Sequence, residues 1–381
     1  MNKWITGSMI TFFLVACACS TQSVETSGLV LQPFAPFEVR DDMLITMGEI
    51  DYSSGGGEIV VIDPVTDTVA GKIRFSGVNG GYVSGAAIGN GRIYVINEGN
   101  PRYPATEIYV VYPAQGKGKT ISMGKTPKGG IIGIQPLSVL YAKKARRFLI
   151  GEAWMGVYMI FDGENDTYLG YMKNEWTKTS FLSVEPIWLG EEEYELYGIC
   201  ENNEVVKWRP ASPEEKVQKM LMIKGQEIGI FPSWSESERY KVFHKVQNYL
   251  VYPVTSPPFV SLEIYNFSNN QAVTNIFLSN LEIFPSSCHA YFIDIYPPSN
   301  WLFVEVMYWT NTKMPGEPEF TWHLIDLNTF RDIGILSYDG PPIIRYDKIY
   351  VRKPIGHKRW ENRIRVYYIT NCSNYIKDIW L

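Results

Sequence analysis

A strand–turn–strand unit that returns about every fifty residues is the feature that most constrains this 381-residue chain. The clearest copy, GEIVVIDPVTDTVAGKIRF from Gly57, alternates apolar and polar residues on both sides of a Pro/Thr/Asp turn, as a β-hairpin does. Related units start at Glu107, Gly156, Glu204, Leu262, Trp322 and Arg363. Their turns begin at Asp63, Tyr112, Asp162, Trp208, Asn266, Asp326 and Ile369, so the successive spacings are 49, 50, 46, 58, 60 and 43 residues.

A second pair of strands precedes most of these hairpins. The segment SGAAIGNGRIYVIN turns at Asn90-Gly91, a strong hairpin signal, and further turns are predicted at 142–147, 190–193, 247–248 and 297–300. Each unit then holds four antiparallel strands, which predicts an all-β chain folded as a seven-bladed β-propeller over residues 35–381. Six blades are the alternative if the weak fourth unit belongs to a neighbour. A two-domain β-sandwich would not explain the recurrence.

The first unit also resembles a known repeat. The segment GEIVVIDPVTDTVAGKI is similar to the repeat of YVTN-type propellers through its V-x-D-x-x-T-x-x-V pattern, from Val61 to Val69. The resemblance covers 57–75 well, covers part of 107–123 and 322–335, and weakens where Tyr112 replaces the Asp. It implies the propeller fold, but such propellers include scaffolds, binding proteins and some enzymes, so it implies no single activity.

The first residues are typical of an export signal. Lys3 precedes the apolar run Met9–Val15, and Leu14-Val15-Ala16-Cys17 resembles the bacterial lipoprotein box. The pattern predicts a signal peptide over 1–16, a lipidated Cys17, and a polar tether over 17–34; an ordinary signal cut near Ala18 or Ser20 is the alternative. By resemblance to Gram-negative sorting, Ala18 after the Cys favours an outer-membrane lipoprotein of the cell envelope, facing the periplasm or the surface. The rest of the sequence has no apolar run of about 18 residues, so no other membrane span is predicted.

Composition excludes two classes of protein. The chain has 35 Lys+Arg against 40 Asp+Glu with no basic block, which argues against a nucleic-acid partner. Only 4 His and 5 Cys argue against a zinc module. Removal of residues 1–16 takes away one cation, so the mature charge is 34 − 40 = −6, and the body is not expected to adhere to anionic lipid. Cys200, Cys288 and Cys372 are interpreted as buried free thiols, although export permits disulfides.

The alternation of strands predicts which loops share a face. The second-to-third connections and the links between units lie at one end of the blades, and they are long and rich in aromatic residues. This face is predicted to bind a partner protein or a glycan, because aromatic and Arg side chains are common anchors. A plainer interpretation has the Trp side chains packing over loop backbones. The predicted partner-binding residues are Tyr52, Arg102, Tyr103, Trp154, Trp176, Trp234, Trp309, His357, Arg359 and Trp360.

Motifs for catalysis are missing from the sequence. There is no G-x-S-x-G elbow, P-loop or H-E-x-x-H segment. Asp162–Asp166 is interpreted as turn chemistry rather than a calcium loop, and His244 and His323 as core residues. The preferred hypothesis is a binding or assembly module without a cofactor. The alternative is a divalent-metal-dependent hydrolase or lactonase in the central channel, with Ca²⁺ held by residues such as Glu152 and Glu185. A purely structural envelope protein is the third possibility.

Overall fold

The computed structural model describes a large part of the chain as strands. The described residues are 26–48, 55–98, 103–123, 136–143, 145–152, 157–173, 187–192, 195–199, 204–208, 218–222, 244–246, 249–256, 259–266, 269, 271–280, 288–308, 319–336, 342–356, 359–369 and 371–381. Two short 3₁₀ turns, η1 (Pro113–Gln115) and η2 (Pro297–Ser299), interrupt them. Within these ranges, no helix has the length and apolarity needed to cross a membrane.

The strands of these ranges form seven four-stranded antiparallel sheets. In six of them the strands lie side by side in chain order. The second sheet contains β5 (Tyr82–Gly89), β6 (Arg92–Glu98), β7 (Glu107–Tyr112) and β8 (Lys117–Ser122), and the third contains β9 (Pro136–Ala142), β10 (Arg147–Glu152), β11 (Val157–Asp162) and β12 (Tyr168–Lys173). The fourth contains β13 (Ile187–Glu192), β14 (Glu195–Ile199), β15 (Glu204–Trp208) and β16 (Gln218–Met222). The fifth contains β17 (His244–Val246), β18 (Tyr249–Ser256), β19 (Phe259–Asn266) and β20 (Gln271–Asn280). The sixth contains β21 (Cys288–Tyr296), β22 (Trp301–Tyr308), β23 (Glu319–Asp326) and β24 (Arg331–Leu336), and the seventh contains β25 (Pro342–Arg345), β26 (Lys348–Gly356), β27 (Arg359–Tyr368) and β28 (Asn371–Trp380).

The first sheet is assembled differently. It contains β2 (Leu44–Met47), β3 (Gly57–Asp63) and β4 (Thr68–Val78), and β1 (Gly28–Leu31) pairs with the free edge of β4. This pairing runs from Gly28 opposite Val78 to Leu31 opposite Phe75. The tether predicted over 17–34 overlaps β1, so that boundary is wrong and the sheet begins before residue 35. The long β4 offers unpaired backbone groups along its edge, and a short alternating segment satisfies them.

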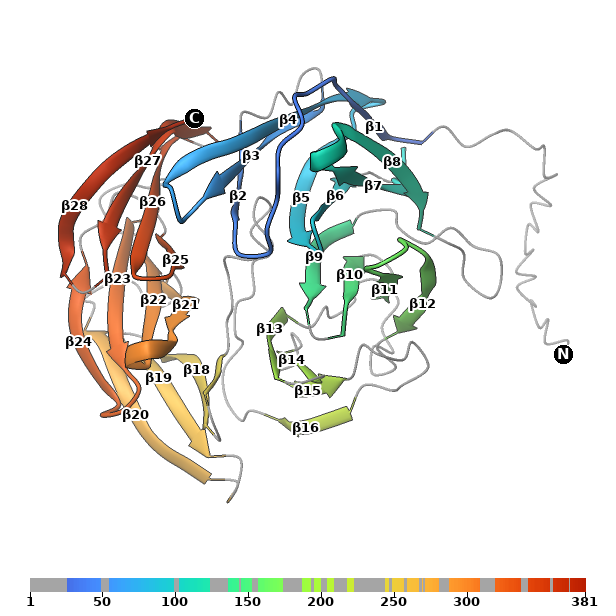
Figure 1. Cartoon of the computed structure of the whole chain (residues 1–381). Coiled ribbons are helices and arrows are strands. Elements are labelled where there is room, and N and C mark those ends of the chain that lie inside the picture. The colour runs from blue at the N-terminus through green and yellow to red at the C-terminus, as the bar shows by residue number, and fades with distance from the viewer. Residues whose placement is uncertain are drawn as a thin grey trace, which may run out of the picture.

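The sheets follow one another around a ring (Figure 1). The last sheet lies beside the first, where β28 contacts β4 and closes the ring. This arrangement confirms the predicted all-β propeller class. The described part holds seven sheets, while the number of blades stays a prediction.

The hydrophobic core lies between neighbouring sheets. Strand β3 is buried on both faces, and its residues alternate between two clusters. Ile59 and Val61 pack with residues of the second sheet, whereas Val60 and Ile62 pack with residues of the last sheet. Similar clusters lie between the second and third, the fifth and sixth, and the sixth and seventh sheets. Each sheet boundary of this kind acts as a packed layer that fixes one sheet against the next.

The predicted hairpins are all found as paired strands. The seven units that begin at Gly57, Glu107, Gly156, Glu204, Leu262, Trp322 and Arg363 form β3–β4, β7–β8, β11–β12, β15–β16, β19–β20, β23–β24 and β27–β28. Asn90 and Gly91 both have positive φ, 52° and 68°, as a two-residue hairpin turn requires. Residues 190–192 of the turn predicted at 190–193 are strand instead, because β13 continues to Glu192, and β14 begins at Glu195.

Candidate functional site

The connections between strands differ at the two ends of the sheets. At one end, the first-to-second and third-to-fourth turns span two to five residues, apart from the nine between β15 and β16 and the twelve between β1 and β2. At the other end, several connections are longer, such as 99–106, 123–135 and 223–243. We call these the short-turn end and the long-loop end.

Most of the predicted partner-binding residues belong to connections of the long-loop end by strand order. Seven of them lie outside the described residues, as do Cys17 and Glu185: Tyr52, Arg102, Trp154, Trp176, Trp234, Trp309 and His357. Tyr103 is described and is half-buried in the connection 99–106. Whether these side chains share one surface stays a prediction.

Two of the predicted loop residues are not in a loop. Arg359 and Trp360 are the first residues of β27, with backbones opposite Gly356 and Pro354 of β26. The hairpin is therefore longer than expected, and only 357–358 connect its strands. Register shifts on both sides of Pro354 accommodate this residue, which has no N–H to donate to the ladder.

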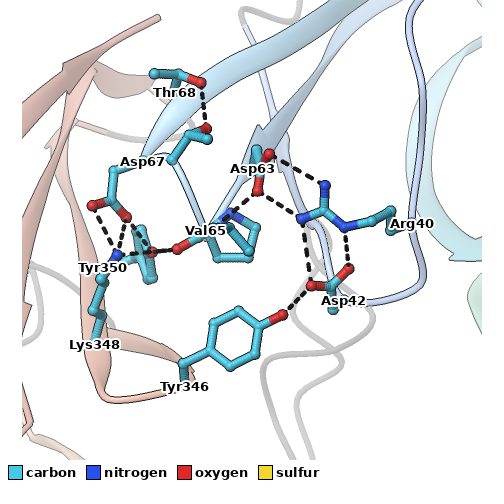
Figure 2. A network of polar contacts seen from close by, with 11 residues as sticks. Arg40, Asp42, Asp63, Val65, Asp67, Thr68, Tyr346, Lys348 and Tyr350 are labelled. Atoms are coloured by element: carbon cyan, nitrogen blue, oxygen red, sulfur yellow. Dashed lines mark hydrogen bonds and ion pairs between the residues drawn. The ribbon is translucent and has the colours of Figure 1, made fainter.

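One network of polar side chains lies at the short-turn end, between the last sheet and the first (Figure 2). Asp67 closes the β3–β4 turn with a positive φ of 52° and is 9% exposed. The Lys348 ammonium donates to both carboxylate oxygens at 2.9 Å, and the Tyr350 hydroxyl donates to Oδ1 at 2.6 Å. The carbonyl of Pro64 accepts from the same two side chains. Burial, and then the bond to Asp67, raise the pKa of the Tyr350 hydroxyl, so this group acts as a donor.

A second cluster of the same design joins the second sheet to the third. Asp166 closes the β11–β12 turn with a φ of 62°. Its carboxylate accepts from Arg92 at 3.0 Å, Lys119 at 3.0 Å and the Tyr94 hydroxyl at 2.6 Å, and also from Tyr112. Burial alone would raise the pKa of Asp166, but the donors outweigh it and the pKa is lowered. The carboxylate is therefore held charged between the sheets.

The two clusters use corresponding positions. A cation and a Tyr stand at the first and third places of a second strand, Arg92 and Tyr94 in β6 and Lys348 and Tyr350 in β26. The acceptor is the last Asp of a D-x-x-x-D turn in the next sheet. The interpretation of Asp162–Asp166 as turn chemistry is confirmed, since Asp162 accepts from the backbone N–H groups of residues 164 and 165. The role of Asp166 across the boundary was missed, and the recurrence of both motifs is the one signal of it that the sequence carries.

An outer layer of charges extends the first cluster (Figure 2). The Arg40 guanidinium donates to Asp63 at 2.7 Å and to Asp42 at 3.1 Å, and the Tyr346 hydroxyl donates to Asp42. The hydrogen bond from Arg40 lowers the pKa of Asp63 to about 2. The segment between β1 and β2 is thereby fastened to the first sheet and to the last.

A buried guanidinium lies farther along the same boundary. Arg352, only 4% exposed, donates to the Thr46 hydroxyl and to the carbonyl of Glu361, both at 2.9 Å, and to the carbonyl of Met47. Burial lowers the pKa of Arg352 to about 10. Lys348, Tyr350 and Arg352 alternate along one strand, so β26 fastens the last sheet to the first with three polar side chains.

The first described residues lie at the long-loop end. The backbone N–H of Ser27 donates to the carbonyl of Pro104 at 3.2 Å, and the Asn97 amide donates to the Ser27 hydroxyl at 3.1 Å. The Asn79 amide donates to the carbonyl of Thr26 at 2.9 Å. Ser27 is 5% exposed, so this segment is fixed between the connections that follow β4 and β6.

The metal hypothesis stays a prediction. Among the described residues, no group of three or more His, Cys, Asp or Glu side chains could hold a metal ion. Glu152 is the last residue of β10, while Glu185 is not described. His323 is confirmed as a core residue, since it is 1% exposed and its Nδ1 lies 2.7 Å from an Asp332 oxygen.

Comparisons with known proteins bear on the fold alone. No protein-family model matches the sequence, and no curated protein matches it. Among solved structures, the dihydro-heme d1 dehydrogenase NirN in complex with DHE is 10% identical over 92% of this chain and 68% of its own, with a TM-score of 0.52. BamB from Moraxella catarrhalis is 10% identical over 92% of each chain, with a TM-score of 0.46, and the designed protein Ika8 reaches 0.48 at 10% identity, over 91% of this chain and 86% of its own. The ring of four-stranded sheets, together with the likeness to NirN, identifies the chain as a β-propeller.

Proposed function

We propose that this propeller is a binding platform of the cell envelope, held there by a lipid on Cys17. It binds a partner protein or a glycan through the long-loop end. The observation that carries the proposal is the difference between the two ends. Buried charged side chains of the short-turn end, such as Asp67 and Asp166, are paired across sheet boundaries, whereas the predicted aromatic and Arg anchors belong to connections of the long-loop end.

A platform of this kind lowers the free-energy cost of association. Side chains that stand on fixed sheets lose little freedom when a partner binds. The Asp67 and Asp166 clusters hold sheets together at the end away from the proposed binding surface. Trp, Tyr and Arg supply most of the strong contacts in protein interfaces, and they are the residue types found in these connections.

Substitution of single Trp residues tests the binding surface. We expect Trp176→Ala and Trp309→Ala each to weaken the affinity for a partner isolated from the envelope by tenfold or more, as at interface hot spots. Tyr368→Ala is the control, because Tyr368 is an aromatic residue 44% exposed at the short-turn end, as the last residue of β27. Unchanged affinity in both loop variants, measured on purified proteins, would remove the long-loop end as the binding surface.

The anchor is tested separately. Cys17→Ser should abolish incorporation of labelled fatty acid and release the protein from the membrane fraction, whereas Cys19→Ser should change neither. Equal lipid incorporation in the two variants would contradict the assignment of Cys17.

A further inference from the structure

The entry point of the chain limits how the molecule can sit on a membrane. Ser27 is fixed at the long-loop end by its bonds to Pro104 and Asn97, and β1 then runs along β4 from Val78 toward the short-turn end. Any anchor that precedes Ser27 therefore pulls on the long-loop end, at the boundary of the first and second sheets.

The tether from the proposed anchor to this point is short. Ten residues separate Cys17 from Ser27. A fully extended segment of this length spans at most about 36 Å, and a flexible one spans roughly 16–19 Å on average. The entry point is therefore held within a short distance of the bilayer surface.

The body is larger than this average span. A domain of this length has a radius of gyration of about 20 Å, and the eleven residues of β4 alone extend roughly 36 Å. With the short-turn end against the bilayer, the tether would have to stretch along the whole height of the first sheet. With the long-loop end against the bilayer, it remains relaxed. The acidic body supplies no attraction of its own to anionic lipid.

We infer that the long-loop end of the first two sheets faces the lipid bilayer, so that the partners it binds are embedded in that membrane or attached to it. This inference rests on the proposed lipid anchor at Cys17. It assigns the proposed binding surface to the membrane side of the molecule, with the short-turn end directed away.

Two valines of the first sheet provide a matched pair of probe positions. Val78 is 43% exposed at the long-loop end of β4, and Val65 is 60% exposed in the β3–β4 turn at the short-turn end. A fluorescent amino acid would replace one or the other in the full chain, purified with its lipid. The protein would be placed on vesicles of phosphatidylethanolamine and phosphatidylglycerol that carry an energy-acceptor lipid. Transfer from position 78 should exceed transfer from position 65 at least about twofold, because the positions lie roughly 36 Å apart along the hairpin.

A variant with a longer tether tests whether the short tether causes this orientation. Insertion of twenty Gly/Ser residues between Ser23 and Val24 leaves β1 and its contacts unchanged, and it should bring the two transfer efficiencies close together. Supporting results are higher transfer from position 78 and its loss on insertion. Vesicle binding with equal transfer, or with higher transfer from position 65, would overturn the orientation alone. Failure of the wild-type chain to float with vesicles would overturn the anchor, and the orientation with it.

Discussion

Asp67→Asn should weaken the closure of the ring, and the structure allows the effect to be worked out. Asp67 has a positive φ of 52° in its turn, a conformation that Asn adopts as readily as Asp. The substitution therefore removes the charge without adding backbone strain, which Ala would introduce. The Lys348 ammonium, whose side chain is 17% exposed, loses its counter-charge.

The loss of stability can be estimated from the hydrogen bonds that the substitution leaves in place. Removal of one partner of a buried ion pair costs about 3–5 kcal/mol. The carbonyl of Pro64 still accepts from Lys348 and from Tyr350, and the amide oxygen of Asn replaces one acceptor, so we expect about 3 kcal/mol. The unfolding entropy of 381 residues is roughly 0.8 kcal/mol per degree. The melting temperature should therefore fall by about 4 °C.

A double-mutant cycle with Lys348→Met makes the measurement specific. Removal of both charges leaves no buried ammonium, so the double variant should be less destabilised than the sum of the single variants. Calorimetry on the purified full chain gives the four melting temperatures. A shift below about 1 °C for Asp67→Asn, or additive shifts in the cycle, would refute the idea that this ion pair secures the boundary.

The remaining predictions concern the pH dependence of stability and the effect of replacing glycines. The pKa of Asp63 is lowered in the folded protein from its ordinary 3.8 to about 2, so its stabilisation is present above pH 4 and is lost as the pH falls toward 2. Asp63→Asn should flatten the fall of the melting temperature over this pH range; an unchanged profile would contradict the pairing with Arg40. Gly56→Ala should destabilise by more than 3 kcal/mol, because φ is +90° and the new Cβ would lie 2.1 Å from a backbone oxygen. Gly80→Ala should cost only about 1 kcal/mol of backbone strain, and Gly334→Ala should be neutral, since nothing lies within 4 Å of either new Cβ. Thermal unfolding ranks the three, and a different order would show that close approach does not decide the effect.

Local patterns in the sequence were enough to predict the hairpins. The Asn90-Gly91 pair encodes a turn by its own conformational freedom, and Asp63 caps its turn by accepting from the backbone N–H of Val65 at 2.9 Å. Each of these interactions joins residues that are close in the chain. For the same reason, the recurrence of such hairpins predicted the propeller class before any long-range contact was known.

Long-range pairing could not be predicted in the same way. β1 is four residues long and pairs with a strand more than forty residues away. Leu29 is buried and Val30 is exposed, but an alternation this short does not differ from that of a tether. The acceptor of Lys348 lies 281 residues away, so the sequence shows the donor and the acceptor without showing that they meet.

At three sheet boundaries of the described part, the same two positions hold polar side chains in two cases and apolar side chains in the third. These positions are the third residue of a second strand and the last residue of a hairpin turn in the next sheet. Tyr350 donates to Asp67 and Tyr94 to Asp166, whereas Val251 belongs to an apolar cluster against which Phe330 packs. Phe330 has a positive φ of 53°, as Asp67 has one of 52° and Asp166 one of 62°. An apolar contact tolerates a small slip between sheets, whereas a buried carboxylate that accepts from Tyr and cationic side chains of the neighbouring sheet fits a single alignment, because any other leaves a charge unpaired.

This difference matters most where the ring closes. Consecutive sheets are kept near their correct alignment by the connection between them, but the first and last sheets are joined by no such connection. Their alignment must come from the boundary itself, and three side chains of β26 supply it through directional bonds to Asp67, Pro64, Thr46 and Met47. The apolar layer of Val60, Ile62 and Ile364 gives this boundary its attraction, and the polar bonds specify its register.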